Sequence, residues 1–526
     1  MSAAEALPVT RSVPRVDPST VLVLVALAQF MVVLDATVVN VALPTIQNAV
    51  GFSEQSLSWV LNAYTLIFGG FLLLGGRLAD RLGRQRIFMT GIAVFSGASL
   101  LCGVSQSEGA LLVARGLQGL GGAMLSPAAL SIILTTFAEG KERNRALSVW
   151  GAIAGAGGAT GLLLGGVIVQ ALSWRWVFFI NVPIGLAVLA LAPRRVPESR
   201  SPSVGRGGYD AEGAVAITLG TMALVFTLIK AETWGWGSGR TLAGFAVAIV
   251  LIGAFVVIER RHENPLVPLR IFSNRSLAAS DATMLVVAAA LFGVFFFCTL
   301  YFQQVLGYNA LKTGIAYLPW TLTTITASTL ASRVVDRFTP KPVLVGGLIL
   351  ATAGFLLLTR ISGSADYATH VLPAMIILGA GLGMSFVPIT ISATNGVAPA
   401  DSGLASGLLN TTQQVGGSLG LAILTTVSTT RTADALHAGS PLPVALTHGF
   451  TGAFVVAAAL CALGAVLALA LLPSRARRPE DEHAETLALS SARSPGALSC
   501  GHLVAARLTA TLGSRPDATR DSITGP

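Results

Sequence analysis

The sequence predicts an all-α integral membrane protein with fourteen transmembrane helices, arranged as two pseudo-symmetric six-helix bundles plus two extra central helices. Of the 526 residues, 53% are hydrophobic and only 11% are charged, and the mean hydropathy is +0.72, whereas soluble domains carry about 25% charged residues. Apolar runs of about 18 residues or more recur along nearly the whole chain, and each is long enough to cross a bilayer as a helix. The cysteines show neither metal-ligand spacing nor a disulfide pattern.

The apolar runs, taken in chain order, define the predicted spans. We interpret as spans residues 21–43, 57–77, 87–105, 110–134, 146–170, 177–193, 211–231, 241–259, 279–306, 312–332, 341–359, 370–396, 404–427 and 448–472. The first run is too long, and lies too far into the chain, for a cleaved signal peptide. An even number of spans places both termini on the same side of the membrane.

Lysine and arginine residues in the connecting segments predict the orientation, because short basic loops stay on the cytoplasmic side. Alternate connections on one side hold eighteen of these residues, and the connections on the other side hold five. We therefore expect both termini in the cytoplasm. The net charge of +9 is explained by these loops, so it does not indicate nucleic-acid binding.

Changes in composition divide the chain into segments. Two stretches rich in Pro, Ser, Gly or charge separate six spans, a pair of spans and six more. We expect a cytoplasmic N-terminal segment (1–20), an N-terminal six-helix bundle (21–193), a cytoplasmic linker (194–210), two additional transmembrane helices (211–259), a second cytoplasmic linker (260–276), a C-terminal six-helix bundle (277–473) and a disordered cytoplasmic tail (474–526).

The two six-span blocks resemble each other weakly. "GGRLADRLGRQRI" after the second span matches "ASRVVDRFTPKPV" after the tenth, which places Asp80 beside Asp336. "GLGGAMLSP" matches "GAGLGMSFVP", which places Pro127 beside Pro388 at nearly the same spacing. Two similarly oriented halves around a central path are typical of secondary transporters with parallel repeats.

An aspartate interrupts the first span, in "FMVVLDATVVNVALP". Asp35 lies about 14 residues into its helix, roughly 21 Å from the cytoplasmic surface, and Arg115 lies about 5 residues into span four, roughly 8 Å from the outer surface. In a core about 30 Å thick, the two charges share a level in the outer half. Ionisable residues inside a membrane face a bundle interior, pair with one another and mark proton or substrate paths.

Several stretches resemble the major facilitator superfamily, and within it the fourteen-span drug:proton antiporter family. "GGRLADRLGRQRI" resembles the superfamily's motif between spans two and three, and "LLVARGLQGLGGA" (Leu111–Ala123) resembles that of span four. "LDATVVNVALPTI" (Leu34–Ile46) and "SWRWVFFINVPIG" (Ser173–Gly185) are similar to motifs of the fourteen-span family in particular. The resemblance covers roughly residues 20–472.

The resemblance implies roles for two sets of residues. Asp35 and Arg115 would couple proton movement to transport, and the alternative is a static ion pair that holds two helices together. A second set would latch the two halves on the cytoplasmic side while the outside is open; it comprises Gly76, Asp80, Arg81, Gly83 and Arg84. For these arginines, positive-inside anchoring is the alternative.

One motif departs from the family pattern. The antiporter motif of span five is usually G-x-x-x-G-P-x-x-G-G, and here it reads "GGATGLLLGG", with Leu162 at the proline position. Its glycines at Gly157, Gly161 and Gly165, spaced by four residues, suit close helix packing, and Gly166 ends the motif. The proline bend is absent.

Polar and aromatic residues within the spans are candidates for a substrate cavity, although each could equally be an interhelical hydrogen bond or an interfacial aromatic. They are Asn40, Asn62, Tyr64, Gln118, Trp150, Gln303, Asn410 and Gln413. The resemblance implies a proton-coupled pump in the bacterial inner membrane that exports lipophilic drugs or antibiotics by alternating access. A selective transporter of an endogenous metabolite (amino acid, siderophore, lipid or secondary metabolite) is the alternative, and a membrane-embedded sensor or enzyme is a remote one.

The sequence holds no phosphate-binding loop and no paired histidine ligands. We therefore expect no enzyme activity, no metal and no cofactor, with the proton gradient as the energy source. The expected partners are a small lipophilic substrate, protons and the lipid bilayer, with no nucleic acid, and a monomer is the expected state.

Overall fold

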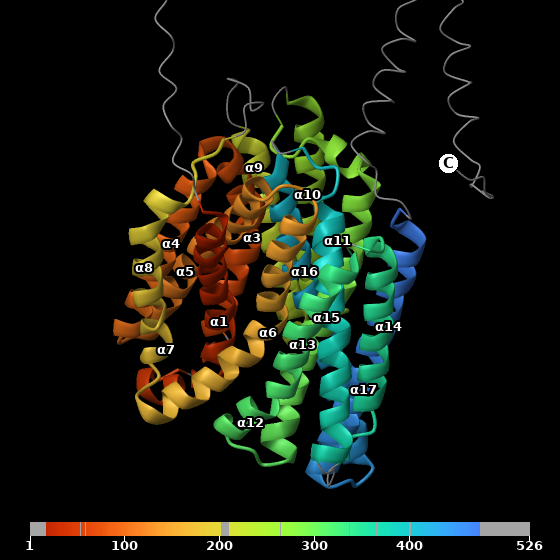
Figure 1. Cartoon of the computed structure of the whole chain (residues 1–526). Helices are drawn as coiled ribbons and strands as arrows, with labels where there is room; N and C mark the ends of the chain where they lie inside the picture. Colours follow the sequence, from red (N-terminus) through yellow and green to blue (C-terminus); the bar gives the residue numbers. More distant parts are fainter. Residues whose placement is uncertain are drawn as a thin grey trace, which may run out of the picture. The chain divides into compact units, whose positions relative to one another are not determined.

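The computed structural model describes residues 17–52, 54–57, 59–200, 210–262, 265–335, 337–362, 367–398 and 401–473, and all regular secondary structure in these ranges is helical (Figure 1). Most of the predicted N-terminal segment, residues 201–209 of the first linker, Asp336 and the predicted tail lie outside the described residues. We call the end of the bundle where α1 begins the proximal face, and the end where α1 finishes the distal face.

Six long helices form the first half of the chain. They are α1 (Pro18–Val50), α3 (Trp59–Leu82), α4 (Arg84–Val104), α5 (Glu108–Thr136), α6 (Lys141–Ala171) and α8 (Asn181–Arg195), with the short α2 (Glu54–Leu57) and α7 (Trp176–Phe179) between them. α5 packs against α3 and α4, while α1 packs against α6 and also contacts α5 and α8.

The second half repeats this plan. It consists of α11 (Arg275–Leu300), α12 (Ala310–Ala316), α13 (Leu318–Val335), α14 (Pro340–Leu358), α15 (Leu372–Thr394), α16 (Ser402–His437) and α17 (Leu442–Leu471), with π-helical turns η2 (Tyr301–Val305) and η3 (Tyr367–Val371). α15 packs against α13 and α14, as α5 does against α3 and α4, and α11 packs against α16 as α1 does against α6. The fifth long helix of each half crosses to the other half, since α6 contacts α13 and α15 while α16 contacts α3 and α5.

Between the halves, the chain adds α9 (Ala211–Trp234), α10 (Gly239–Arg261) and the 3-10 turn η1 (Leu269–Ser273). α9 packs against both α3 and α16, and Lys230 lies 5.1 Å from the ring centre of Trp59 on α3. Trp236, after α9, donates through Nε1 to Thr426 Oγ1 on α16 at 2.8 Å. The extra pair is therefore attached to both halves along one seam.

Eleven of the described helical segments are long and apolar enough to cross a membrane. The three predicted spans without such a segment correspond to α6, to α12 with α13, and to α16. α6, α13 and α16 make the contacts between the two halves. A helix that packs against protein along its length does not need the uniformly apolar surface of a lipid-facing one, which explains their Gly-, Ser- and Thr-rich sequences.

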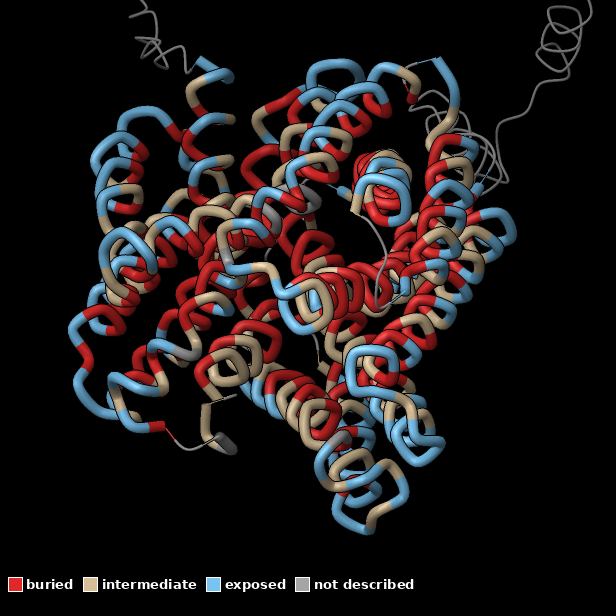
Figure 2. Tube along the Cα trace, turned by 90° about the horizontal axis from the view of Figure 1, so that it is seen from below, coloured by how far each residue is buried: buried red, intermediate tan, exposed pale blue. Residues whose placement is uncertain are grey.

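Small residues bring the helices of each half into close contact. A side chain at Gly75 on α3 would collide with the backbone of Ala123 on α5, and one at Gly383 on α15 would collide with Thr324 on α13. Both halves also place a proline inside a buried stretch of helix, Pro127 in α5 and Pro388 in α15. Figure 2 shows buried residues concentrated where helices of the bundle face one another, with exposed residues on the outer surfaces.

Candidate functional site

α1 carries Asp35 near its middle. The helix starts at Pro18 after Asp17, whose Oδ1 accepts a hydrogen bond from Ser19 N at 3.1 Å, and hydrogen bonds from Thr20 and Ser19 hold the pKa of Asp17 below its ordinary value. α1 ends at Gly51, where φ is +86°, a conformation that favours glycine. The uninterrupted helix fixes the direction in which Asp35 points.

One face of α1 lies directly on α6, at the glycines of the predicted antiporter motif. Side chains at Gly157, Gly161 and Gly165 would collide with Val33, Thr37 and Val38 respectively. Gly166 is also buried, and so is Leu162, which continues α6 without a break. Because Asp35 is two residues from Val33 and from Thr37, it faces away from α6.

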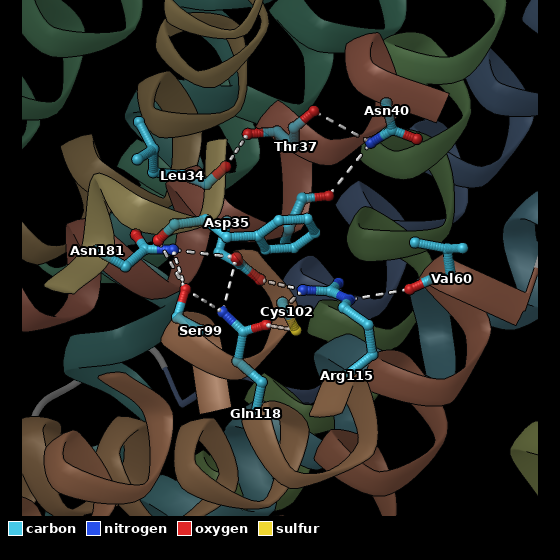
Figure 3. Close-up of polar contacts among 12 residues, drawn as sticks. Leu34, Asp35, Thr37, Asn40, Val60, Ser99, Cys102, Arg115, Gln118 and Asn181 are labelled. Atoms are coloured by element: carbon cyan, nitrogen blue, oxygen red, sulfur yellow. Dashed lines mark hydrogen bonds and ion pairs between the residues drawn. The ribbon is translucent and has the colours of Figure 1, made fainter. Parts of the chain in front are cut away.

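Asp35 faces Arg115, and both side chains are fully buried (Figure 3). Arg115 Nη1 lies 2.6 Å from Asp35 Oδ2, and Arg115 Nε donates to the carbonyl oxygen of Val60 on α3 at 2.9 Å. The pair therefore joins α1, α3 and α5. Two buried opposite charges in contact compensate each other's desolvation only when the remaining donors and acceptors are also satisfied.

Three further polar side chains complete the cluster (Figure 3). Gln118 Nε2 donates to Asp35 Oδ1 at 2.8 Å, and Gln118 Oε1 accepts from Arg115 Nη1 at 2.9 Å. Asn181, the first residue of α8, donates through Nδ2 to Asp35 Oδ1 at 3.1 Å. Ser99 Oγ on α4 accepts from both amides, at 3.1 Å each, and donates to Phe178 O at 2.8 Å.

Aromatic rings cover the cation. The Arg115 guanidinium carbon lies 4.5 Å from the ring centre of Tyr64 and 5.8 Å from that of Phe178, a distance at which a ring face attracts a cation. Tyr64 stacks on Phe68 at 5.5 Å between ring centres. The buried Arg115 Nη2, Tyr64 Oη and Asn181 Oδ1 have no hydrogen-bond partner among the described residues.

The other candidate cavity residues are dispersed. Asn40 is exposed and donates to its own helix, at Ala36 O and Thr37 O (Figure 3). Asn410 accepts from Ser126 Oγ at 3.4 Å, linking α16 to α5. Trp150 is buried in the main core and Gln303 is exposed in η2, while Asn62 and Gln413 are partly buried. Of the eight candidates, the structure brings Tyr64 and Gln118 to the Asp35 cluster.

A cavity of about 600 Å³ lies at the distal ends of α14 and α17, lined by Thr359, Ile361, Ser362, Pro441, Pro443, Val444, Thr447, His448 and Thr451. It shares no residue with the Asp35 cluster. None of its lining residues carries a carboxylate, so it offers no group that resembles the buried Asp35.

The predicted latch residues join the two halves at the proximal face. Asp80 is fully buried, and its Oδ1 and Oδ2 accept from the backbone N–H groups of Gly403 and Leu404, at 3.1 and 3.0 Å, in the first turn of α16. A negative charge is stabilised at a helix N-terminus. Gly76 allows this approach, because a side chain there would collide with Gly403 O.

The latch arginines lie around Asp80. Arg84 Nη2 donates to Asp80 Oδ1 at 2.8 Å, and Arg84 Nη1 donates to Ser199 Oγ at 3.2 Å in the segment after α8. Gly83 has φ +116°, and a side chain there would meet the carboxylate of Glu198. Arg81 is partly buried in the last turn of α3. The proximal face is therefore held closed at the α3–α16 seam.

Asn181 and Ser99 were not predicted from the sequence as members of the Asp35 cluster. Asn181 lies inside "SWRWVFFINVPIG", where its position next to an apolar run was visible but its contact with Asp35, 146 residues away, was not. Ser99 is one of several small polar residues in its span, and nothing in the sequence distinguishes it. Among the described residues, no group of three His, Cys, Asp or Glu side chains is placed to hold a metal ion.

Comparison with known proteins agrees with this architecture. The family model described as Major Facilitator Superfamily matches residues 25–421. The solved structure of the human organic anion transporter MFSD10 is similar at a TM-score of 0.61, with 14% identity, over 86% of this chain and 99% of its own. The structure of the proton:xylose symporter XylE is similar at a TM-score of 0.61, with 16% identity, over 89% of this chain and 98% of its own.

Curated relatives are more similar in sequence. The puromycin resistance protein pur8 of Streptomyces alboniger is 42% identical over 88% of this chain and 92% of its own length. The cephamycin export protein CmcT of Amycolatopsis lactamdurans is 39% identical over 85% and 92%. The tetracenomycin C resistance and export protein of Streptomyces glaucescens is 36% identical over 79% and 77%. The chain is thus a transporter and not an enzyme, a multi-pass membrane protein of the bacterial exporter type, and it belongs to the Major Facilitator Superfamily.

Proposed function

We propose that the protein exports an antibiotic or a similar lipophilic compound across the bacterial inner membrane in exchange for protons. The observation that carries the proposal is the fully buried Asp35, held by Arg115, Gln118 and Asn181 in the middle of a membrane-spanning bundle. An ionisable group in such a place is costly and marks a proton or substrate path. The relatives named for antibiotic resistance and export support the direction of transport.

In this mechanism, Asp35 is the group that takes and releases the proton. As an anion it accepts three hydrogen bonds and pairs with Arg115. A proton on the carboxyl group weakens its attraction for Arg115, which retains Val60 O, Gln118 Oε1 and the Tyr64 ring as partners. Loss of the ion pair loosens the contact of α1 with α5, and this loosening is the step that allows the bundles to move.

Alternating access requires that the two faces open in turn. The contacts of Asp80 with the first turn of α16 correspond to a closed proximal face. We propose that the proximal face is cytoplasmic, with both termini there, because the basic loops lie on that side. We also propose that α6, α13 and α16 span the membrane together with the eleven apolar segments, which gives fourteen spans.

The proposed coupling is tested in inverted membrane vesicles with an acid interior, in which a fluorescent dye reports the pH gradient. Puromycin and a panel of lipophilic cations and neutral antibiotics are added to wild type, to Asp35→Asn and to the matched control Asp434→Asn, an exposed carboxylate at the end of α16. We expect compounds that discharge the gradient in wild type and in Asp434→Asn but not in Asp35→Asn. Equal discharge by all three proteins would make Asp35 structural.

A second candidate is a narrow exporter of one secondary metabolite. Four of the relatives are each named for a single compound: puromycin, cephamycin, tetracenomycin C and lincomycin. Another relative, from Mycobacterium tuberculosis, is named a multidrug resistance protein, so the names support both a narrow and a broad range of substrates. The same panel separates them, because a narrow exporter would respond to one chemical class and leave the remaining compounds inert.

A further inference from the structure

Two buried acids lie at the proximal ends of the two extra helices. Asp210 precedes α9 and is 3% exposed, and its Oδ1 accepts from Gly213 N at 2.7 Å. Glu259, in the last turn of α10, is 4% exposed. Its Oε1 accepts from Leu266 N at 3.1 Å and from Val267 N at 3.2 Å. Glu259 thus fixes the segment 265–267, which we call the turn after α10.

Each of these carboxyl groups keeps one oxygen that no described residue hydrogen-bonds. Asp210 Oδ2 and Glu259 Oε2 are both buried and have no partner, and the two carboxyl groups are close enough to interact with each other. Two buried carboxylates cannot both be ionised at such a site without strong repulsion. One proton placed between the two unpaired oxygens removes one charge and supplies the missing hydrogen bond.

The turn that Glu259 fixes also contacts both halves of the transporter. Arg77 on α3 donates through Nη2 to Pro265 O at 3.1 Å, and its Nη1 lies 3.6 Å from Asp401 Oδ1, immediately before α16. Leu266 and Val267 are buried in one hydrophobic cluster with residues of α3, α9, α10, α11 and α16, namely Leu73, Ala216, Ile217, Phe255, Leu277, Leu404, Ala405 and Leu408. The turn therefore packs against both α3 and α16, at the seam between the two halves.

We propose that Asp210 and Glu259 form a proton-binding site that holds the turn after α10 in the α3–α16 seam and so stabilises the closed proximal face. The ligand is a single proton shared by the two carboxyl groups. This site is separate from Asp35, and its role is to set the balance between the closed and the open proximal face.

The surrounding charges are compatible with one retained negative charge. Arg77 interacts with Glu259 and also with Asp80, Arg81 and Asp401. Among the described residues, the charged or titratable residues next to the pair on its own segments are Glu212, Arg260, Arg261 and His262. Because Arg77 also faces Asp80 and Asp401, it cannot compensate a doubly ionised pair, and one shared proton reduces the negative charge beside it.

The direction of the effect follows from proton binding. The closed state holds one proton, and opening exposes both carboxyl groups to water, where both ionise at neutral pH. A lower pH on the proximal side therefore favours closure. With one proton released on opening, the open-to-closed ratio changes by up to tenfold for each pH unit. If the proximal face is cytoplasmic, as proposed above, the gate responds to cytoplasmic pH.

The test measures the gate directly, without transport. Spin labels at two exposed positions, Leu82 at the end of α3 and Phe272 in η1, report their separation by double electron–electron resonance in lipid nanodiscs between pH 5.5 and 8.5. We expect the short-distance fraction of wild type to fall as the pH rises. Glu259→Gln keeps a hydrogen-bond donor toward Asp210 at every pH, so its short-distance fraction is expected to change less than twofold. Glu212→Gln, an exposed acid in the first turn of α9, serves as the matched control and should follow wild type.

The proposal is overturned if the wild-type distances are independent of pH, or if Glu259→Gln titrates like wild type. Should Glu259→Gln fail to give a monodisperse protein, Asp210→Asn tests the same shared proton from the other side. The same measurement in the Asp35→Asn background separates the two proposals: an unchanged pH profile there leaves the gate site standing whether or not Asp35 couples transport.

Discussion

Removal of one charge from the Asp35–Arg115 pair should destabilise the protein more than removal of both. Arg115→Met leaves Asp35 fully buried, with amide donors from Gln118 and Asn181 but no cation. Asp35→Asn leaves Arg115 with Val60 O, Gln118 Oε1 and the Tyr64 ring. The double variant buries no charge at this position.

The magnitudes follow from this difference in remaining partners. An uncompensated buried charge costs about 3–5 kcal/mol, which we expect for Arg115→Met. Asp35→Asn removes a charged hydrogen-bond acceptor, and because several partners of Arg115 remain we expect a cost of about 2 kcal/mol. Replacement of a buried pair by uncharged residues of similar volume is often close to neutral. The double variant should therefore be more stable than Arg115→Met by about 2 kcal/mol or more.

Reversible unfolding in mixed micelles, with increasing mole fraction of dodecyl sulfate, gives the four free energies of the cycle. Each variant is first checked for a monodisperse elution profile, so that all four proteins enter the cycle in the same state. If the free-energy losses of the two single variants simply add in the double variant, the charges do not compensate each other. That outcome would refute the description of the cluster as one coupled electrostatic unit.

Three further predictions concern other parts of the structure. Gly161→Ala places a methyl group against Thr37 and should cost about 1–3 kcal/mol in unfolding free energy, while Gly253→Ala, which meets no atom within 4 Å, should cost far less in the same assay. Asn181→Leu removes the hydrogen bonds donated to Asp35 and Ser99. We expect the proposed proton-coupled transport to slow roughly tenfold. An equal loss of transport in Asn62→Leu would show that any polar-to-apolar change in a span has this effect. Asp80→Asn removes the negative charge at the first turn of α16 and should weaken closure by up to about 2 kcal/mol. Maleimide labelling of a single cysteine on the proximal face should then accelerate, and unchanged labelling would exclude the latch.

The apolar runs were sufficient to predict the order of the helices and their approximate bounds. The first predicted span, 21–43, lies inside α1, and the span at 110–134 lies inside α5. The number of membrane spans was harder to establish, because hydropathy detects contact with lipid. α6, α13 and α16 instead contact other helices along the seams between the halves. Packing of this kind depends on partners that are distant in sequence.

The candidate site was predictable in its charged pair and not in its polar neighbours. Counting residues from each membrane surface placed Asp35 and Arg115 at one level, and in the structure they are in contact. The amide of Asn181 and the hydroxyl of Ser99 reach the same cluster from α8 and α4. The order in which the helices are arranged around the bundle decides which polar side chains join the cluster. The periodicity of residues within one helix carries no information about that order. The same limitation hid the contacts of the extra helices with α3 and α16.

The matched contacts of α6 with α13 and of α16 with α3 form an interface with approximate two-fold symmetry, of the kind that two copies of a six-helix chain would make in a homodimer. In such a dimer both seams would be equally strong. Here α9 and the turn after α10 are inserted beside the α3–α16 seam, and the α6–α13 seam has no counterpart among the described residues. If the halves move as proposed, separation at the α3–α16 seam requires that the turn after α10 be displaced, whereas separation at the α6–α13 seam does not. The two seams between the similar halves are therefore unequal, and the extra helices can act on only one of them.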